Sequence, residues 1–354
     1  MVTDTHQLID AVKQYYPVAQ FFKDRYFPDG KTFFSEEVWI DSKKQGRKIA
    51  PFVIPKINGI AIESEGIRTD RIKAPTIALK MAITPEDLEK RAFGEDPNSN
   101  RAPADREREV EADHIDEMRN SILRRHEKMC TDIITTGEIE IKQYANANDA
   151  AADANAQVRV LKYYDTAFDN RYKTSKKFKS MTAQEKIDTL HKMASTLHKR
   201  GFKASDLVLT GDISAEMFSD PEFLDYYDKR RANLGTIDPT TLPDGVACNG
   251  TINVNGVMLT IFTYDEYYLA ADGTETAFLP AYTVAMLTPG LGTTVYGQVT
   301  FVKDGNFQSY AEKLVPRSVA SDVDNIKETQ LFSRPVPYPV FTDSWLYLNA
   351  DKTN

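Results

Sequence analysis

The feature that most constrains the fold is a long, one-sided helix expected over residues 104–136. Its apolar residues recur every three or four positions, which places them on one stripe of an α-helix. Most other positions are charged, with acidic residues in the first half and basic residues later, as the helix macrodipole prefers. Gly137 supplies a stop. At about 1.5 Å per residue the helix is roughly 50 Å long, which indicates a strut. The stripe consists of Val110, His114, Ile115, Met118, Ile122, His126, Met129 and Ile133.

An aromatic cluster lies ahead of this helix, after a short helical pattern over residues 8–16 that Pro17 ends. Two interpretations of the cluster remain open. It forms a segment of the core, or it belongs to an arm that only a neighbouring copy covers, because a large exposed apolar patch usually marks a binding surface. Its members are Phe21, Phe22, Tyr26, Phe27, Phe33 and Phe34.

Residues 36–83 show short β-favouring runs separated by Gly, Pro and charged residues, which predicts a long hairpin. A hairpin with so few apolar residues is poorly stable alone, so we expect it to lie on something else. Its basic turn lacks the interleaved aromatics of a nucleic-acid contact, which favours a solvated turn. The basic residues of this turn are Lys43, Lys44, Arg47 and Lys48.

The rest of the chain reads as a mixture of strands and helices. A capping box, Thr182 with Glu185, begins one of the helices. The expected elements are strands at 138–142 and 158–162 joined by a mobile Ala-rich loop, a helix at 182–199, a strand at 207–210, a helix at 213–231, several strands between 250 and 301, and an extended tail at 329–348.

Length and composition set further limits. A chain of 354 residues predicts two or three structural regions. The net charge of −8 argues against a protein that grips nucleic acid strongly along its surface. Cys130 and Cys248 form no metal-binding spacing and are expected to be reduced. No signal peptide and no membrane span is recognised, so we expect a soluble protein, intracellular when made.

A search for catalytic chemistry finds no supported site. His191 and His198 are seven residues apart on one helix, too far for the pairing of a zinc helix, and are interpreted as structural. The glycines of residues 289–292 fit a strand turn better than a phosphate loop. No nucleophile has a recognisable histidine partner. We therefore predict no catalytic, metal or cofactor site.

Several stretches together resemble the major capsid proteins of lambda-type tailed bacteriophages. Each is only moderately specific, but their order covers nearly the whole chain. They are Glu95-Asp-Pro97 before the long helix, the run from that helix to the β segment at 133–141, the strand at 255–264 after a glycine turn, Asp272-Gly273, Phe278-Leu-Pro280, Tyr296-Gly297, and the tail segments 331–337 and 345–348.

The resemblance implies an α+β protein with the Hong Kong 97-type phage capsid fold. It implies an N-terminal arm at residues 1–30, an extended hairpin (E-loop) at 31–83, and an axial domain at 204–315. The peripheral domain would comprise residues 84–203 and 316–354, with a spine helix at 104–136. Neither a cofactor nor a covalent crosslink between subunits is expected.

The resemblance also implies the partners. Subunits would assemble as pentamers and hexamers into an icosahedral head around double-stranded DNA, without sequence-specific contact to the DNA or contact with a membrane. A scaffolding protein and a portal would take part in assembly, and a decoration protein would bind the shell. The protein would be found in the virion, and in the host cytoplasm before assembly.

Two assembly hypotheses follow. The aromatic arm and the hairpin would supply the apolar surface that neighbouring subunits bury, because neither is completed within one subunit. The basic turn would dock on the acidic first half of a neighbour's long helix, at Glu107, Glu109 and Glu111. Two alternatives remain open: a prophage-derived or cellular nanocompartment shell of the same fold, and an uncharacterised soluble cytoplasmic enzyme.

Overall fold

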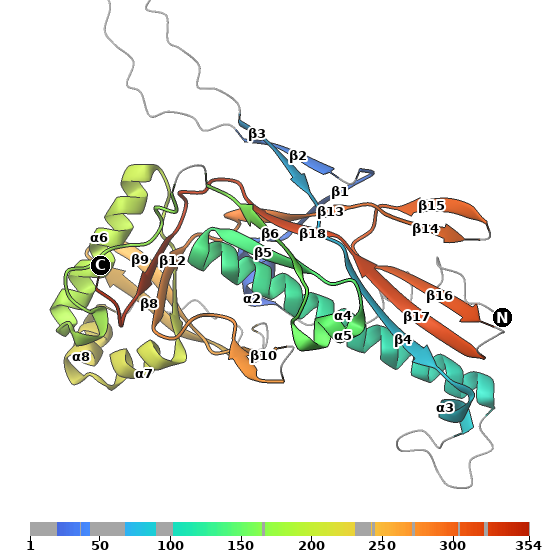
Figure 1. The fold of residues 1–354 in the computed structure, drawn as a ribbon. Helices are drawn as coiled ribbons and strands as arrows, with labels where there is room; N and C mark the ends of the chain where they lie inside the picture. The colour runs from blue at the N-terminus through green and yellow to red at the C-terminus, as the bar shows by residue number, and fades with distance from the viewer. Residues whose placement is uncertain are drawn as a thin grey trace, which may run out of the picture. The chain divides into compact units, whose positions relative to one another are not determined.

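The computed structural model describes residues 20–35, 37–42, 68–89, 102–164, 167–230, 242, 245–270, 273–303, 305–321 and 325–353 (Figure 1). Two compact units are present. Unit 1 comprises Met1–Glu36, Lys73–Cys130 and Thr294–Tyr338, and unit 2 comprises Glu37–Ile72, Thr131–Thr293 and Pro339–Asn354. These limits differ from the arm, hairpin, peripheral and axial regions that the resemblance implies, so that division stays a prediction.

The long helix is confirmed as α4, Pro103–Thr136. Its stripe is buried from Ile115 to Ile133, whereas Val110 and His114 are half-buried. Gly137 ends the helix with φ +73° and donates its backbone N–H to the Ile133 carbonyl at 2.9 Å. A Cβ at this position would lie 2.3 Å from the Phe168 ring. Both the left-handed backbone and the lack of space therefore require glycine here.

Unit 1 is built around antiparallel strands. β16 (Val315–Ser321), β17 (Ile326–Ser333) and β4 (Ile77–Ile83) form one sheet in that order, and Leu331 of β17 clusters with Met118 and Ile122 of α4. β1 (Asp29–Phe33) runs parallel to β13 (Gly292–Gly297), which also pairs with β18 (Pro335–Pro339). The unit also contains α2 (Phe21–Tyr26), α3 (Pro85–Glu89) and a hairpin of β14 (Val299–Lys303) and β15 (Asn306–Tyr310).

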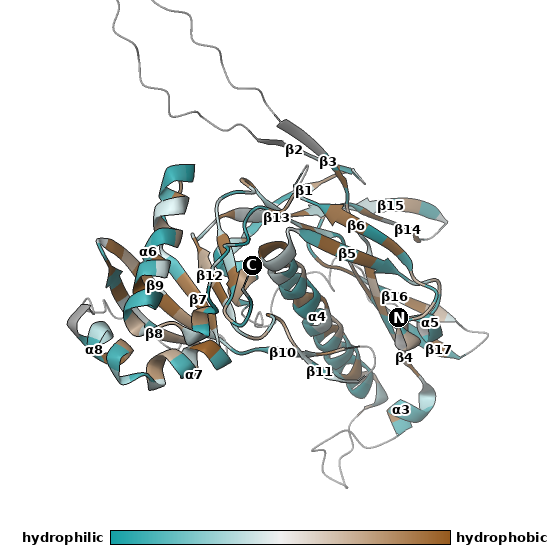
Figure 2. Ribbon diagram, turned by 60° about the vertical axis from the view of Figure 1, so that its left-hand side comes forward, coloured by the Kyte–Doolittle hydropathy of each residue, from teal (hydrophilic) through white to brown (hydrophobic). Residues whose placement is uncertain are grey.

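Unit 2 contains a five-stranded sheet with helices on one face, and its apolar core lies between the two layers (Figure 2). The strand order is β19 (Leu346–Asn349), β12 (Thr283–Leu287), β7 (Asp206–Thr210), β9 (Val257–Tyr264) and β8 (Val246–Val254). The helices are α6 (Ala183–Arg200), α7 (Gly211–Ser219) and α8 (Pro221–Arg230). The predicted capping box begins α6, since Thr182 and Glu185 bond to each other's backbone N–H.

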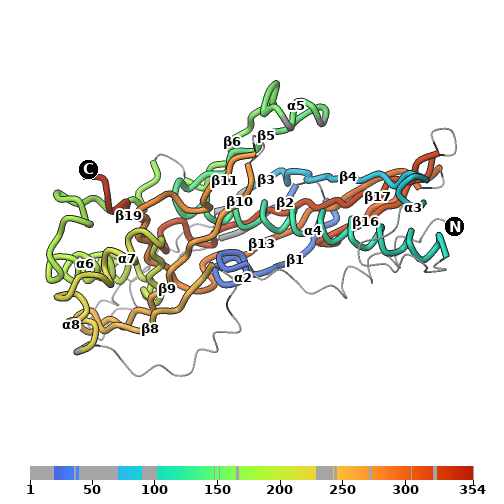
Figure 3. Tube along the Cα trace, turned by 90° about the horizontal axis from the view of Figure 1, so that it is seen from below, coloured from blue at the N-terminus to red at the C-terminus, as the bar shows by residue number. Residues whose placement is uncertain are grey.

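Among the described residues, three two-stranded hairpins belong to unit 2 outside this sheet. β5 (Glu138–Gln143) pairs with β6 (Gln157–Lys162), and the short helix α5 (Ala147–Ala152) stands at the far end of this hairpin (Figure 3). β10 (Tyr267–Leu269) pairs with β11 (Glu275–Ala277). β2 (Glu37–Ser42) pairs with β3 (Arg68–Lys73).

Several sequence-based expectations need correction. The single helix expected at 213–231 is two, α7 and α8, because Pro221 lacks the N–H that would continue the first. The expected loop at 145–156 contains α5, begun by the Asn146 side chain. Within the hairpin region, β2 pairs with β3, whereas β1 and β4 pair with β13 and β17, strands far away in the sequence. The helix expected at 8–16 and the strands near 52–54 and 60–62 lie outside the described residues.

Candidate assembly surfaces

The aromatic cluster is mostly part of the core of its own chain. Phe21, Phe22, Tyr26 and Phe27 are 5% exposed or less, and Phe21 packs edge-to-face on Phe22 and Tyr26. The hypothesis that only a neighbouring copy buries these side chains is therefore wrong for these four. The other two behave differently, since Phe33 is half-buried and Phe34 is 77% exposed. An interface role remains a prediction for these two.

A buried carboxylate explains why α2 packs against its own chain. Glu127 of α4 accepts the backbone N–H groups of Phe22 and Lys23 at 2.9 and 3.0 Å. The residue before the helix, Gln20, makes no side-chain cap. Glu127 therefore satisfies donors in the first turn of α2 that a short helix leaves unpaired, and its charge lies at the positive end of the helix.

Asp29 anchors the segment that follows α2. Its carboxylate accepts the Tyr296 hydroxyl at 2.6 Å and pairs with Lys313 at 2.7 Å and Lys23 at 3.0 Å. Burial by itself would raise the pKa of Asp29. The hydrogen bonds from Lys313, Tyr296 and Lys23 outweigh burial and lower this pKa to about 2. The carboxylate is thus charged over the whole neutral range.

His126 lies beside this network, fully enclosed, with its ring 6.0 Å from that of Tyr296. Neither ring nitrogen has a hydrogen-bond partner among the described residues. Burial lowers the pKa of His126 to about 3, helped by the Lys23 charge and opposed by Asp29. His126 is therefore a packing residue of the α4 stripe.

The acidic first half of α4 is partly neutralised within the chain. Lys327 of β17 contacts Glu107 at 2.7 Å and Glu111 at 3.0 Å, and Glu111 is buried. Glu109 is half-buried. The structure thus gives two of the three expected docking carboxylates an internal cation. The basic turn with Lys43, Lys44, Arg47 and Lys48 lies outside the described residues, so the docking stays a prediction.

Besides Phe34, the most exposed large apolar side chains of the described residues stand on the two-stranded hairpins, at positions that were not predicted from the sequence as interface residues. On the β14–β15 hairpin, Phe307 is 82% exposed and lies opposite Val302, also exposed. Leu269 of β10 is 69% exposed and Trp39 of β2 is 59% exposed. On β6, Val158 and Val160 are exposed as well.

A signal for such positions is present in the sequence. A glycine turn followed by an aromatic residue predicts a short hairpin, here with Gly305 at φ +76° just before Phe307. Strands in a lone hairpin have no second layer, so an apolar residue on the outer face has nothing to pack against.

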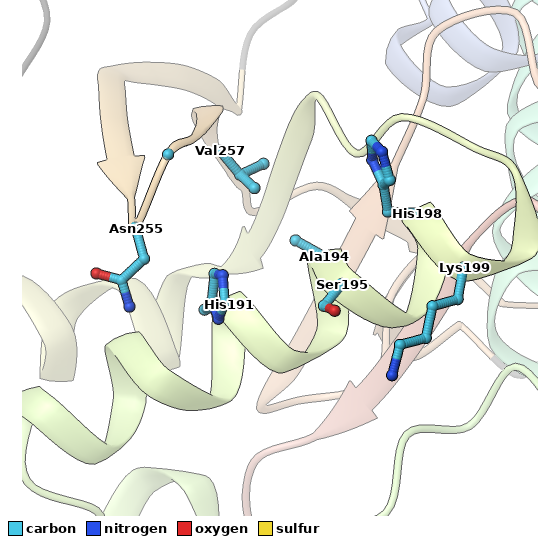
Figure 4. Close-up of a pocket in the computed structure, with 8 residues that line it drawn as sticks. His191, Ala194, Ser195, His198, Lys199, Asn255 and Val257 are labelled. Carbon is cyan, nitrogen blue, oxygen red and sulfur yellow. The ribbon is translucent and has the colours of Figure 1, made fainter.

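No catalytic constellation appears among the described residues. His191 and His198 line one side of an open depression of about 410 Å³ between α6 and the β8–β9 turn (Figure 4). Across the described part of the chain, His, Cys, Asp and Glu side chains nowhere gather in threes as a metal would require. No described helix is long and apolar enough to cross a membrane.

Comparison with solved structures defines the class of protein. A putative capsid protein of a prophage from E. coli CFT073 matches with a TM-score of 0.70 and 16% identity over 99% of both chains. A phage-related protein from Bordetella bronchiseptica RB50 matches with a TM-score of 0.52 and 12% identity over 99% of this chain and 98% of that one. The fold is therefore the Hong Kong 97-type phage capsid fold, as expected.

Sequence comparison identifies the family. Residues 4–348 match the family described as phage major capsid protein E, so the chain belongs to that family and is a structural subunit of a phage head. A holo-SrpI encapsulin from Synechococcus elongatus PCC 7942 also matches in structure, with a TM-score of 0.42 and 9% identity over 100% of this chain and 99% of that one. No curated protein sequence matches significantly.

Proposed function

We propose that this protein assembles as pentamers and hexamers into an icosahedral head that encloses double-stranded DNA, and that it does so without a catalytic step. Family membership over residues 4–348 is the observation that carries the proposal. The proposal extends to a scaffolding protein and a portal during assembly, a decoration protein on the finished shell, and a period in the host cytoplasm beforehand.

Exposed apolar residues, including Phe34 and residues of the hairpins, supply a physical driving force for assembly. Fully burying one large apolar side chain stabilises a contact by about 1.5–3 kcal/mol. Phe34, Trp39, Leu269 and Phe307 are each more than half exposed in the single chain. Because a closed shell repeats every contact by symmetry, even a modest gain per residue favours assembly.

Electron microscopy of the purified protein tests this proposal. We expect closed shells in negative stain, and a fast boundary in sedimentation velocity that carries nearly all of the protein. Shells from infected cells should contain nuclease-protected DNA. Shells filled with a cargo protein and no DNA would instead support the nanocompartment alternative, and a monomer at micromolar concentration with head genes co-expressed would contradict assembly altogether.

A further inference from the structure

The segment from residue 171 to residue 203, which contains α6, differs in charge from the rest of the protein. Residues 171–203 contain ten Lys or Arg residues against two acidic ones, a net of +8, whereas the whole chain carries −8. Both acidic residues, Glu185 and Asp188, lie in the first half of α6. A positive surface on an acidic protein attracts anionic partners locally.

About half of these cations already have internal partners. Lys176 pairs with Glu185, Arg200 pairs with Asp169, and Lys177 and Lys179 share Asp351. Among the described residues, no carboxylate pairs with Arg171, Lys173, Lys192, Lys199 or Lys203. These cations are thus available to interact with solvent or with a bound anionic partner.

Two of these lysines belong to one face. Lys192 and Lys199 are seven residues apart on α6, which is two turns or about 10 Å along the same side. Both are exposed. The depression of about 410 Å³ lies along this face and has no carboxylate in its lining.

The polar groups of the lining suit an anion, and Ala194, Gly256 and Val257 complete it. Figure 4 shows His191, Ser195 and Lys199 projecting from α6 and the Asn255 side chain approaching from the β8–β9 turn. An ammonium, a hydroxyl, an amide and imidazole rings are the groups that commonly donate hydrogen bonds to phosphate oxygens. We propose that this face, formed by the second half of α6 and the β8–β9 turn, binds phosphate groups of a nucleic acid backbone without reading its sequence.

A nucleic acid fits this face better than an acidic protein does. Protein interfaces depend on buried aromatic or aliphatic anchors. None of the strongly exposed apolar residues of the described chain lies on α6. The inference rests on the proposed function, since enclosed DNA is the polyanion that a head subunit meets at high concentration.

Salt-dependent binding tests the inference. Anisotropy of a fluorescein-labelled 20-base-pair duplex should be titrated with the unassembled full-length chain from about 50 to 200 mM salt, where each lost phosphate contact lowers the log–log slope by about 0.9. For the Lys192→Ala/Lys199→Ala double variant, we expect a slope smaller by about 2 and roughly 10- to 100-fold weaker binding at the lowest salt. The Lys192→Arg/Lys199→Arg variant should keep the salt slope and the affinity of the unaltered chain.

A matched control separates this face from net charge. Lys142→Ala/Lys162→Ala removes the same charge from exposed positions on the β5–β6 hairpin and should change affinity less than about 2-fold. Equal losses in both double variants, or no loss in either, would overturn the inference. Displacement of the duplex by polyglutamate as effectively as by unlabelled duplex would assign the face to an acidic protein instead.

Sedimentation of the same preparations keeps the two proposals apart. Normal shells together with unchanged DNA affinity in the α6 variant would reject only the phosphate-binding face. Failure of the unaltered chain to form shells with the head genes co-expressed would reject the proposed function, whatever the anisotropy shows.

Discussion

Two aromatic regions of unit 1 differ sharply in burial. Phe22 of α2 is completely buried against its own chain, whereas Phe307 of the β14–β15 hairpin is 82% exposed. Both are Phe residues in short elements. The difference is a covering layer: α4 packs on α2 and anchors it through Glu127, while none of the described residues of unit 1 covers the Phe307 side chain.

Aromatic content therefore does not by itself distinguish a core segment from an interface. A short helix with a buried carboxylate at its N-terminus can be completed within one chain. A two-stranded hairpin always has an outer face that no second layer covers. Apolar residues on that face stay exposed until another molecule covers them.

Phe22→Ala should destabilise the unassembled chain most. Removing a fully buried Phe costs about 3–5 kcal/mol, because transfer and cavity terms add. The urea midpoint of unfolding, followed by fluorescence, measures this. Phe307→Ala serves as the matched variant and should change the free energy of unfolding by less than about 0.5 kcal/mol. Similar losses of unfolding free energy in both variants would contradict the difference in burial between Phe22 and Phe307.

Acid should loosen the contact between α2 and α4. The pKa of His126 is lowered to about 3 in the fold, so the folded state disfavours the proton that an exposed histidine binds near pH 6.5. This contribution is fully present above pH 6.5 and lost progressively as the pH falls. At pH 4.5 the loss is about 2–3 kcal/mol, from about 1.4 kcal/mol per pH unit.

Urea unfolding between pH 7 and pH 4.5 measures this loss. His126→Met removes the titrating group from the same apolar space and should flatten the profile in this window. An unchanged slope in that variant would show that another group is responsible.

Phe307→Ser should impair assembly while leaving the subunit stable. If the side chain is buried between subunits, losing it costs about 1.5–3 kcal/mol per contact and raises the assembly concentration roughly 10-fold or more. Light scattering against protein concentration provides the measurement. Phe307→Leu should assemble nearly as the unaltered protein does. Normal assembly of the Ser variant would remove this hairpin from the interface.

Glu127→Gln should weaken the anchor of α2 by about 1–2 kcal/mol, because charge-assisted bonds to two N–H groups become neutral ones. Faster hydrogen exchange of the Phe22 and Lys23 amides would measure this weakening at the N–H groups that Glu127 accepts. Glu117→Gln, an exposed change on the same helix, is the control and should leave these amides protected. Equal protection in both variants would assign the anchor to the aromatic packing instead.

Sequence periodicity predicted the regular elements well where the signal was local. The stripe of α4 and the Thr182–Glu185 capping box are both confirmed. The predictions were wrong where the structure depended on a single residue or on a strand far away in the sequence. Pro221 divided one expected helix, and β4 pairs with β17, a strand more than 240 residues away in the chain.

The sequence alone determined the long strut, the capsid resemblance and the absence of a recognisable catalytic motif, because each depends on short-range order of residue types. The tertiary structure was needed to establish which aromatics face inward, which carboxylates already have a cation, and which lysines of residues 171–203 have no carboxylate partner among the described residues. The physical reason is that burial and charge pairing depend on segments far apart in the chain. Glu127 and Phe22 are 105 residues apart, and no local pattern records their contact.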